Sequence, residues 1–197
     1  MYKVLDTELL EITGRQSDVI ELALTYGFNG INVDIVDLYK RCQRTNYESA
    51  SRFLVSSKLI VASFSLPISL DDDETTFSNR FDQLKSIVDI AGNCSARCGA
   101  LDVPNGTDRL PYPEYFDVVR KRIDQIAELL ATKGIRLALR LKAVPEGSEK
   151  QFKFVRDVGG LVALVRSCTS KNAGVVLDSW NWHLGGGVPS HLDDIGI

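Results

Sequence analysis

The segment YPEYFDVVRKRIDQIAELLATKGIRLALRL, residues 112–141, is the most informative part of the sequence for the fold class. Its first part, 114–133, has apolar side chains at helical spacing, and Gly134 is the kind of residue that ends a helix. The apolar segment 135–141 that follows is short and is predicted to be a strand. The stretch is therefore predicted to be a helix that turns directly into a strand, which is the repeating step of an α/β fold.

The same alternation extends in both directions along the chain. Helical spacing predicts a helix that begins near Ser17 and ends before Gly27, and a long amphipathic helix over 77–90. Strands and helices alternate almost from end to end, with strands at 28–35, 59–66, 94–103 and 174–178 and further helices at 47–58 and 152–167. Strands separated by helices predict a parallel sheet, either open and doubly wound or closed into a barrel.

Composition predicts a single globular domain over 1–197. The chain has 197 residues, 44% hydrophobic and 25% charged, with a net charge of −3. The length suits one domain but is short for a complete eight-unit barrel, which has about 250 residues. The charge gives no reason to expect nucleic acid or an anionic membrane. No apolar run reaches the roughly 20 residues of a membrane span, and 1–13 does not resemble a signal peptide, so a cytoplasmic location is expected.

Two clusters have a functional and a structural interpretation. Cys94 and Cys98, four residues apart and placed by this reading on one face of a strand, suggest half a zinc site or a redox pair. Buried thiols are the alternative, because two more ligands are needed and no histidine is near in sequence. The acids at 71–74 suggest a calcium site, or favourable charges at a helix N-terminus. The glycines at 185–187 lack the spacing and the lysine of a phosphate loop.

Three segments resemble the xylose-isomerase-like barrel superfamily, in the expected order and spacing. GFNGIN at 27–32 resembles its second strand, whose pattern is GF-(D/N)-G-I-E. LPYPE at 110–114 with GIRLAL at 134–139 resembles its fourth helix running into its fifth strand. VVLDSWNWH at 175–183 is similar to the sixth-strand LDSWHW motif of its sugar isomerase/epimerase members.

This resemblance implies a (β/α)8 TIM-barrel type fold, incomplete here because about six parallel βα units fit in the chain, with a truncated C-terminus. It implies a sugar (phosphate) isomerase/epimerase that moves a proton on a small carbohydrate. Family members hold a divalent metal (Mn2+, Mg2+ or Zn2+) with a Glu, an Asp, a His and a Glu from strands five to eight. Such an ion anchors substrate oxygens and stabilises an enediolate. Active sites in this fold lie at the carboxyl ends of the strands.

The sequence departs from that ligand set. Arg140 stands where the strand-five Glu is expected, and Asn181 stands where a His is expected three residues after Asp178. Strands seven and eight, with their ligands, have no counterpart, so Asp178 alone remains. His183 is a replacement ligand if the strand continues past Asp178, and otherwise a loop histidine. The alternative is therefore a non-catalytic, degenerate family member, either a binding module or a remnant of the fold, with no metal.

Other residues of these segments complete the expected site. The guanidinium of Arg140 can occupy the metal position and pair with Asp178, either to bind an anionic or polyhydroxyl ligand or as a structural ion pair. On an extended chain Trp180 and Trp182 share a face, and the resemblance places them, Asn181 and Asn32 at the substrate. Core packing is the alternative for the tryptophans.

Two further expectations concern partners. Some relatives of this barrel are base-excision endonucleases, but those need a three-metal cluster and basic loops, whereas this chain has two histidines and a negative charge. A six-unit sheet leaves two edge strands and an apolar interior without cover, so self-association is expected.

Overall fold

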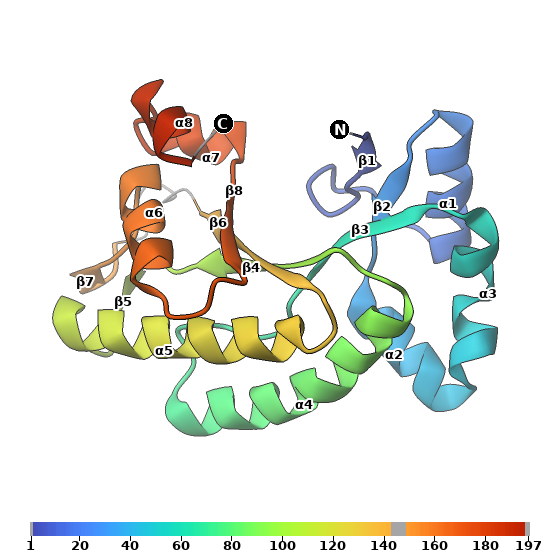
Figure 1. The fold of residues 1–197 in the computed structure, drawn as a ribbon, viewed down its shortest axis with the longest axis horizontal. Coiled ribbons are helices and arrows are strands. Elements are labelled where there is room, and N and C mark those ends of the chain that lie inside the picture. Colours follow the sequence, from blue (N-terminus) through green and yellow to red (C-terminus); the bar gives the residue numbers. More distant parts are fainter. Residues whose placement is uncertain (1, 143–148, 196–197) are drawn as a thin grey trace.

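The computed structural model describes residues 2–142 and 149–195 and contains a six-stranded parallel sheet (Figure 1). The strands pair in chain order, so each βα step adds its strand beside the previous one. The α/β prediction with about six parallel units is confirmed. The strands are β1 (Val4–Leu5), β2 (Gly30–Asn32), β3 (Ile60–Ser65), β4 (Cys98–Val103), β6 (Arg136–Leu141) and β8 (Ala173–Val176).

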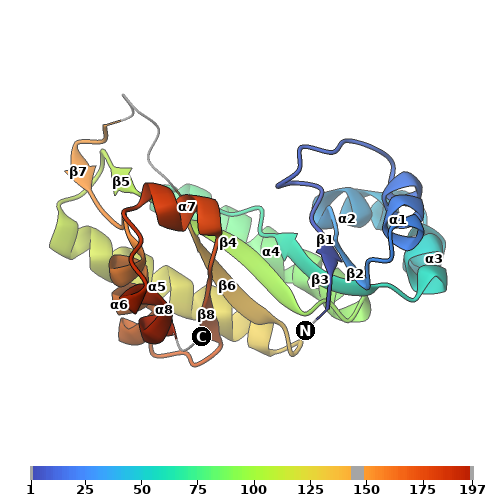
Figure 2. The same cartoon turned by 90° about the horizontal axis from the view of Figure 1, so that it is seen from above.

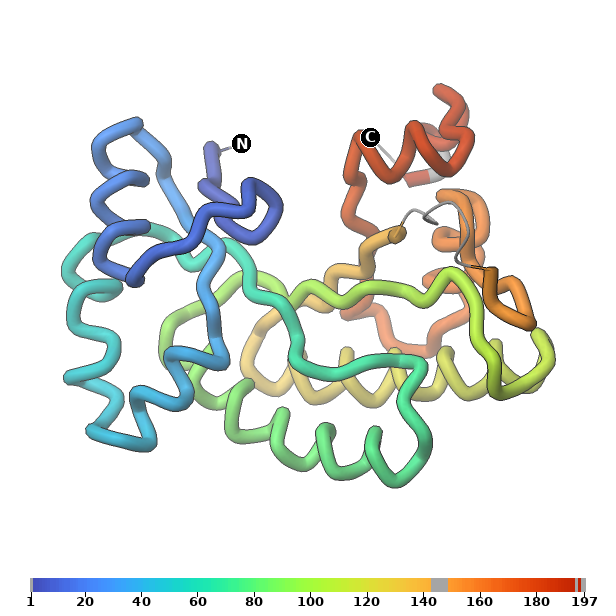
Figure 3. The backbone as a smooth tube through the Cα atoms, turned by 180° about the vertical axis from the view of Figure 1, so that it is seen from behind, coloured from blue at the N-terminus to red at the C-terminus, as the bar shows by residue number. Residues whose placement is uncertain are grey.

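Helices connect the strands and pack around them in the same order. They are α1 (Gln16–Thr25), α2 (Ile35–Arg44), α3 (Tyr47–Ser57), α4 (Glu74–Asn93), α5 (Tyr112–Ala131), α6 (Val158–Ser167), α7 (Ser179–Leu184) and α8 (Ser190–Ile195). Two short strands, β5 (Gly106–Thr107) and β7 (Phe152–Lys153), form a separate antiparallel pair. From behind, α1–α3 and α6–α8 lie at opposite ends of the molecule, joined by the long helices α4 and α5 (Figure 3).

Side chains of β6 alternate between the two faces of the sheet, and this alternation sets the position of Arg140. Leu137, Leu139 and Leu141 are almost fully buried and belong to the hydrophobic core. Side chains alternate between the two faces of a strand, so Ala138 and Arg140 lie on the opposite face. That face carries the polar residues at the strand ends.

The acids at 71–74 belong to a helix start and its preceding turn. Asp73 is the N-cap of α4, and its carboxylate accepts a hydrogen bond from the backbone N of Thr76 at 2.9 Å. Asp71 accepts hydrogen bonds from the hydroxyls of Thr107 at 2.7 Å and Tyr115 at 2.8 Å. The cluster therefore fixes the β3–α4 connection, as the helix-start interpretation predicts.

The sheet has two edges within the described residues. β1 pairs only with β2, and β8 pairs only with β6 (Figure 2). Each therefore presents backbone donors and acceptors on its outer side that no described strand pairs with. In the described part of the chain, no helix is long and apolar enough to cross a membrane.

Several element boundaries differ from those expected. The strand predicted over 28–35 is only Gly30–Asn32, because Asp34 caps α2, a helix that the apolar pattern concealed. The strand predicted over 94–103 begins at Cys98, since α4 runs on to Asn93. The helix predicted over 152–167 begins at Val158, after β7. The segment 178–183, predicted to be extended, is α7 with its cap.

Candidate functional site at the strand ends

Polar side chains from four strands and the segments after them meet at the carboxyl ends of the strands. Glu8 follows β1, Ser65 ends β3, and Asp102 and Arg140 lie near the ends of β4 and β6. All these strands run in the same direction, so their carboxyl ends meet at the same edge. In parallel α/β sheets, ligands bind at this edge.

The guanidinium of Arg140 is held mainly by Asp102. The two residues are register partners on β4 and β6, and Nε of Arg140 lies 2.7 Å from Oδ1 of Asp102. Lys142 adds a second cation, with Nζ 3.5 Å from Oδ2 of the same carboxylate. The Arg140 side chain is only 15% exposed, so the charge-assisted bond to Asp102 is partly shielded from water.

The segment after β1 reaches across the same edge. A carboxylate oxygen of Glu8 accepts a hydrogen bond from the hydroxyl of Ser65, and its other oxygen lies 3.8 Å from Nη2 of Arg140. Asn32, buried at the end of β2, donates from Nδ2 to the carboxylate of Asp6 at 3.2 Å. The amide of Asn32 is therefore engaged in positioning the segment that carries Glu8.

Glu8, Ser65, Asp102, Arg140 and Lys142 line a cavity of about 430 Å³, whereas Asn32 does not belong to its lining. The charged groups around it balance, with three carboxylates and three cations among the described residues. They are Glu8, Asp71, Asp102, Arg140, Lys142 and Lys150. Lys150 is itself paired with Asp108 at 2.6 Å, and this contact raises the pKa of the lysine. The cavity therefore offers many hydrogen-bonding groups without an excess of either charge. We call this cavity and its six charged residues the mouth.

Asp178 does not pair with Arg140, which differs from the expected ion pair. Arg140 is aligned with Val176 of β8, and Asp178 lies two residues further along. The carboxylate of Asp178 instead caps α7, where it accepts a hydrogen bond from the backbone N of Asn181 at 2.8 Å. Among the described residues, no ion pair joins Arg140 to Asp178.

The aromatic motif after Asp178 is helical, so its side chains do not alternate across an extended chain. Trp180 is 67% exposed, and His183 is exposed as well. Trp182 packs against the core, and its indole Nε1 is buried without a hydrogen-bond partner among the described residues. Because this segment is a helix, Trp180 and Trp182 do not share a face as the sequence predicted. For the same reason, His183 does not continue the strand that was expected past Asp178.

The metal centre that the resemblance implies does not fit the residues present. Within 2–142 and 149–195, no group of three or more His, Cys, Asp or Glu side chains comes together. Asp178 is engaged in capping, His183 is exposed, and Arg140, which the resemblance aligns with a ligand, is a cation paired with Asp102. A divalent ion needs several convergent oxygen or nitrogen ligands, which these residues do not supply.

The cysteine pair is separated as well. Cys94 caps the end of α4 and its Sγ lies 3.4 Å from the hydroxyl of Tyr47, whereas Cys98 lies on β4. Burial raises the pKa of both thiols, which keeps them protonated. Both are free, and the interpretation as half a zinc site or a redox pair has no support from this geometry.

Asp102 and Glu8 were not expected as site residues, although the sequence gives a weak indication of each. Asp102 is a single charge inside an otherwise apolar strand, between Leu101 and Val103. Glu8 belongs to an acidic segment that follows β1, a strand of only two residues that lacks a clear pattern. A charge within a buried strand signals a paired or functional group.

Comparisons with known proteins agree with this architecture. The sequence model of a family described as xylose isomerase-like TIM barrel matches residues 20–195. No curated protein sequence matches the chain. A xylose isomerase domain protein from Alicyclobacillus acidocaldarius superposes with a TM-score of 0.82 at 22% identity, over 95% of this chain and 66% of that one. This chain thus spans about two thirds of that protein.

Two further solved structures are similar. The IOLI protein with a bound zinc atom superposes with a TM-score of 0.80 at 14% identity, over 98% of this chain and 68% of that one. The 3-keto-D-glucoside 4-epimerase YcjR from E. coli superposes with a TM-score of 0.71 at 15% identity, over 100% of this chain and 76% of that one. At these identities the likeness concerns the fold.

Proposed function

Since the chain belongs to the xylose isomerase-like TIM-barrel family, we propose that it is a sugar isomerase/epimerase-like protein that binds a small, uncharged carbohydrate in the mouth. The similar E. coli structure is an epimerase of a keto-glucoside, which supports a carbohydrate as the ligand class. The observation that carries the proposal is the Arg140–Asp102 contact of 2.7 Å at the lining of the cavity. Such a fixed pair presents donors and acceptors together, as sugar hydroxyls require.

The balance of charge in the mouth argues for an unphosphorylated sugar. Three carboxylates offset three cations among the described lining residues, and Arg140 already has Asp102 as its counter-ion. A phosphate group would need positive charge in excess of what the carboxylates neutralise. A neutral polyhydroxyl molecule needs only hydrogen-bonding partners.

Calorimetric titration with D-fructose and with its phosphate ester tests this proposal. We expect the free sugar to bind at least as tightly as the ester, and the change Arg140→Gln to weaken binding at least tenfold. Arg136→Gln is the matched control, since Arg136 is an exposed arginine at the opposite end of the same strand. Tighter binding of the ester, or equal losses in both variants, would contradict the proposal.

A second candidate is the metal-assisted isomerisation or epimerisation itself, which the zinc-bound relative favours. The residues that the sequence suggests for it are Asp178, His183 and Arg140. Titration of metal-stripped protein with Mn2+ tests it directly. Micromolar binding that disappears in Asp178→Ala would support this candidate. Absence of binding would leave carbohydrate binding as the function of the mouth.

A further inference from the structure

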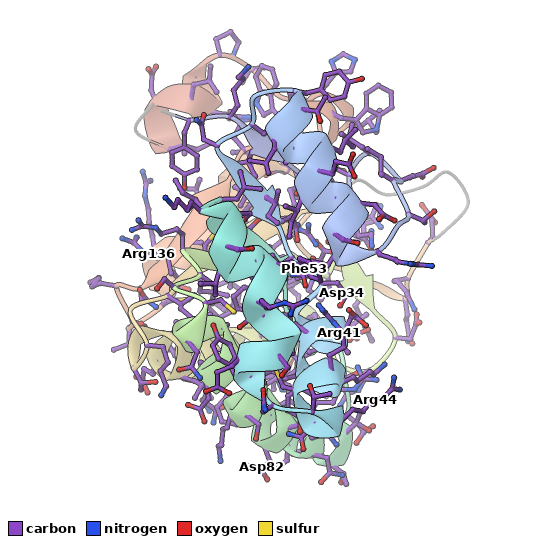
Figure 4. All side chains as sticks on the ribbon, turned by 90° about the vertical axis from the view of Figure 1, so that its right-hand side faces the viewer. Asp34, Arg41, Arg44, Phe53, Asp82 and Arg136 are labelled. Carbon is purple, nitrogen blue, oxygen red and sulfur yellow. The ribbon has the colours of Figure 1, made fainter. Side chains whose placement is uncertain are left out.

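A second and larger cavity lies outside the mouth. Its volume is about 980 Å³, and it is formed by the first turns of α1 and α2, by Phe53 of α3, and by the segments that follow β1 and β3. In Figure 4 Phe53, Asp34 and Arg41 lie together where α1, α2 and α3 meet. The proposed carbohydrate site does not use this cavity, although Glu8, Ser65 and Leu66 belong to the walls of both.

The inner wall of this cavity is apolar. Ile31, Val33 and Ile35 line it and are almost completely buried. Phe53 lines it as well but is 53% exposed, so half of an aromatic side chain remains in contact with solvent beside an apolar surface. A concave surface with apolar walls and an accessible aromatic ring is typical of a site for an organic ligand.

Two charged side chains of the wall, Arg41 and Asp34, are hydrogen-bonded within the protein. The guanidinium of Arg41 contacts Asp37 Oδ2 at 2.9 Å and the backbone O of Ala50 at 3.1 Å, and it also donates to Oε1 of Gln16. The carboxylate of Asp34 accepts from the backbone N of Asp37 at 2.9 Å. These two groups already have partners, so neither has to find a counter-ion on a ligand.

One polar group in the wall lacks a partner. Arg41 orients the side-chain amide of Gln16 by donating a hydrogen bond to the amide oxygen Oε1. The amide nitrogen Nε2 of Gln16 is buried and has no hydrogen-bond partner among the described residues. Buried donors normally find an acceptor. An oxygen atom on a bound molecule, reached by a small movement of the Gln16 side chain, satisfies this donor.

We propose that this cavity is a second ligand site for an uncharged molecule with a flat aromatic ring and a carbonyl or ether oxygen. The ring packs between Phe53 and the apolar wall formed by Ile31 and Val33. The oxygen accepts the hydrogen bond from Nε2 of Gln16. The site is independent of the carbohydrate proposal, since none of these residues lines the mouth.

Prodan, a neutral naphthalene ketone whose emission shifts to the blue in an apolar site, tests the proposal on the full chain. We expect saturable binding with blue-shifted emission. Phe53→Ala should weaken it at least fivefold by removing the ring, and Gln16→Met at least threefold by removing the amide donor. Tyr26→Ala is the control, because Tyr26 is an exposed aromatic residue outside the cavity.

Circular dichroism before each titration establishes that a variant is folded, and the two variants act on separate walls of the cavity. Equal affinity of all four proteins for prodan would show that the dye binds elsewhere and would overturn the proposal. Absence of blue-shifted emission in the parent protein would overturn it as well. Failure of the fructose titration would leave it untouched, so the two proposals fail separately.

Discussion

At the scale of single residues, the partners of Arg140 differ in distance and in expected strength. Asp102 lies at 2.7 Å and Glu8 at 3.8 Å from its guanidinium. A double-mutant cycle of Asp102→Asn with Arg140→Gln should give a coupling free energy of about 1 kcal/mol, reduced from a buried pair because Asp102 is 39% exposed. The cycle of Glu8→Gln with Arg140→Gln should give less than about 0.5 kcal/mol. Denaturant unfolding measures both, and the reverse order would contradict the geometry.

The phenols of Tyr47 and Tyr115 should make the protein less stable at high pH. Burial and the contact with Cys94 raise the pKa of Tyr47 to about 12, and burial and the bond to Asp71 raise the pKa of Tyr115. The folded protein therefore holds these protons more tightly than the unfolded chain. The unfolding free energy should be constant below about pH 10 on their account and fall as pH rises from there towards 12. Tyr47→Phe should flatten this fall, and an unchanged slope would argue against burial of the phenol.

The position of Arg140 near the carboxyl end of a strand was predictable from the sequence, but its partner was not. Its place in the motif-bearing strand follows from spacing along the chain. Its partner depends on the alignment of β6 with its neighbours, which places Asp102 and Val176 beside Arg140 and leaves Asp178 two residues beyond. Register between strands distant in sequence is set by packing of the whole sheet.

At the scale of elements, α7 depends on its capping residue. Asp178 accepts the backbone hydrogen bond of Asn181 at 2.8 Å, so Asp178→Ala should destabilise the helix by about 1 kcal/mol. Asp178→Asn should retain most of the stability, because asparagine caps as well as aspartate. Hydrogen exchange of the α7 amides measures the effect locally. Equal protection in Asp178→Ala and the parent would contradict a capping role.

The elements that the sequence predicted best were α4 and α5, in which apolar residues recur at helical spacing over many residues. Short elements were missed, because the apolar run through Ile35 continued past the strand into α2. The segment after Asp178 was predicted to be extended for a similar reason. Alternating aromatic residues fit a strand, whereas the capping carboxylate and the following Ser179–Leu184 form a helix.

At the scale of the whole molecule, the edges of the sheet predict self-association. The backbone groups of Asn172 and Gly174 point towards β6, and Leu137 N donates to Asn172 O at 3.0 Å. Backbone groups alternate in direction along a strand, so the N–H of Ala173 points to the outer side of β8. Sedimentation velocity should show sedimentation coefficients that rise with protein concentration. Ala173→Pro removes an outward donor and should weaken the association. A single monomeric species at all concentrations would contradict this prediction.

The fold lineage as a whole was predictable, because six βα steps and three family-like segments all agree with one architecture. The expectation of an apolar interior was less accurate. The sheet face that carries Arg140 also carries Ser63, Ser65 and Ala138, which are small or polar. Sequence patterns show which residues are apolar, but the face that each one occupies depends on strand boundaries that only the structure provides.

The two tryptophans of the chain both lie in α7, immediately after the sheet edge that carries the mouth. Intrinsic indole emission from this protein therefore originates in a single short helix. Trp180 is accessible to aqueous quenchers, whereas Trp182 is packed against the core. Iodide quenching separates the two contributions without any label. The protein thus contains its own optical reporter of α7 and of the part of the core against which Trp182 packs.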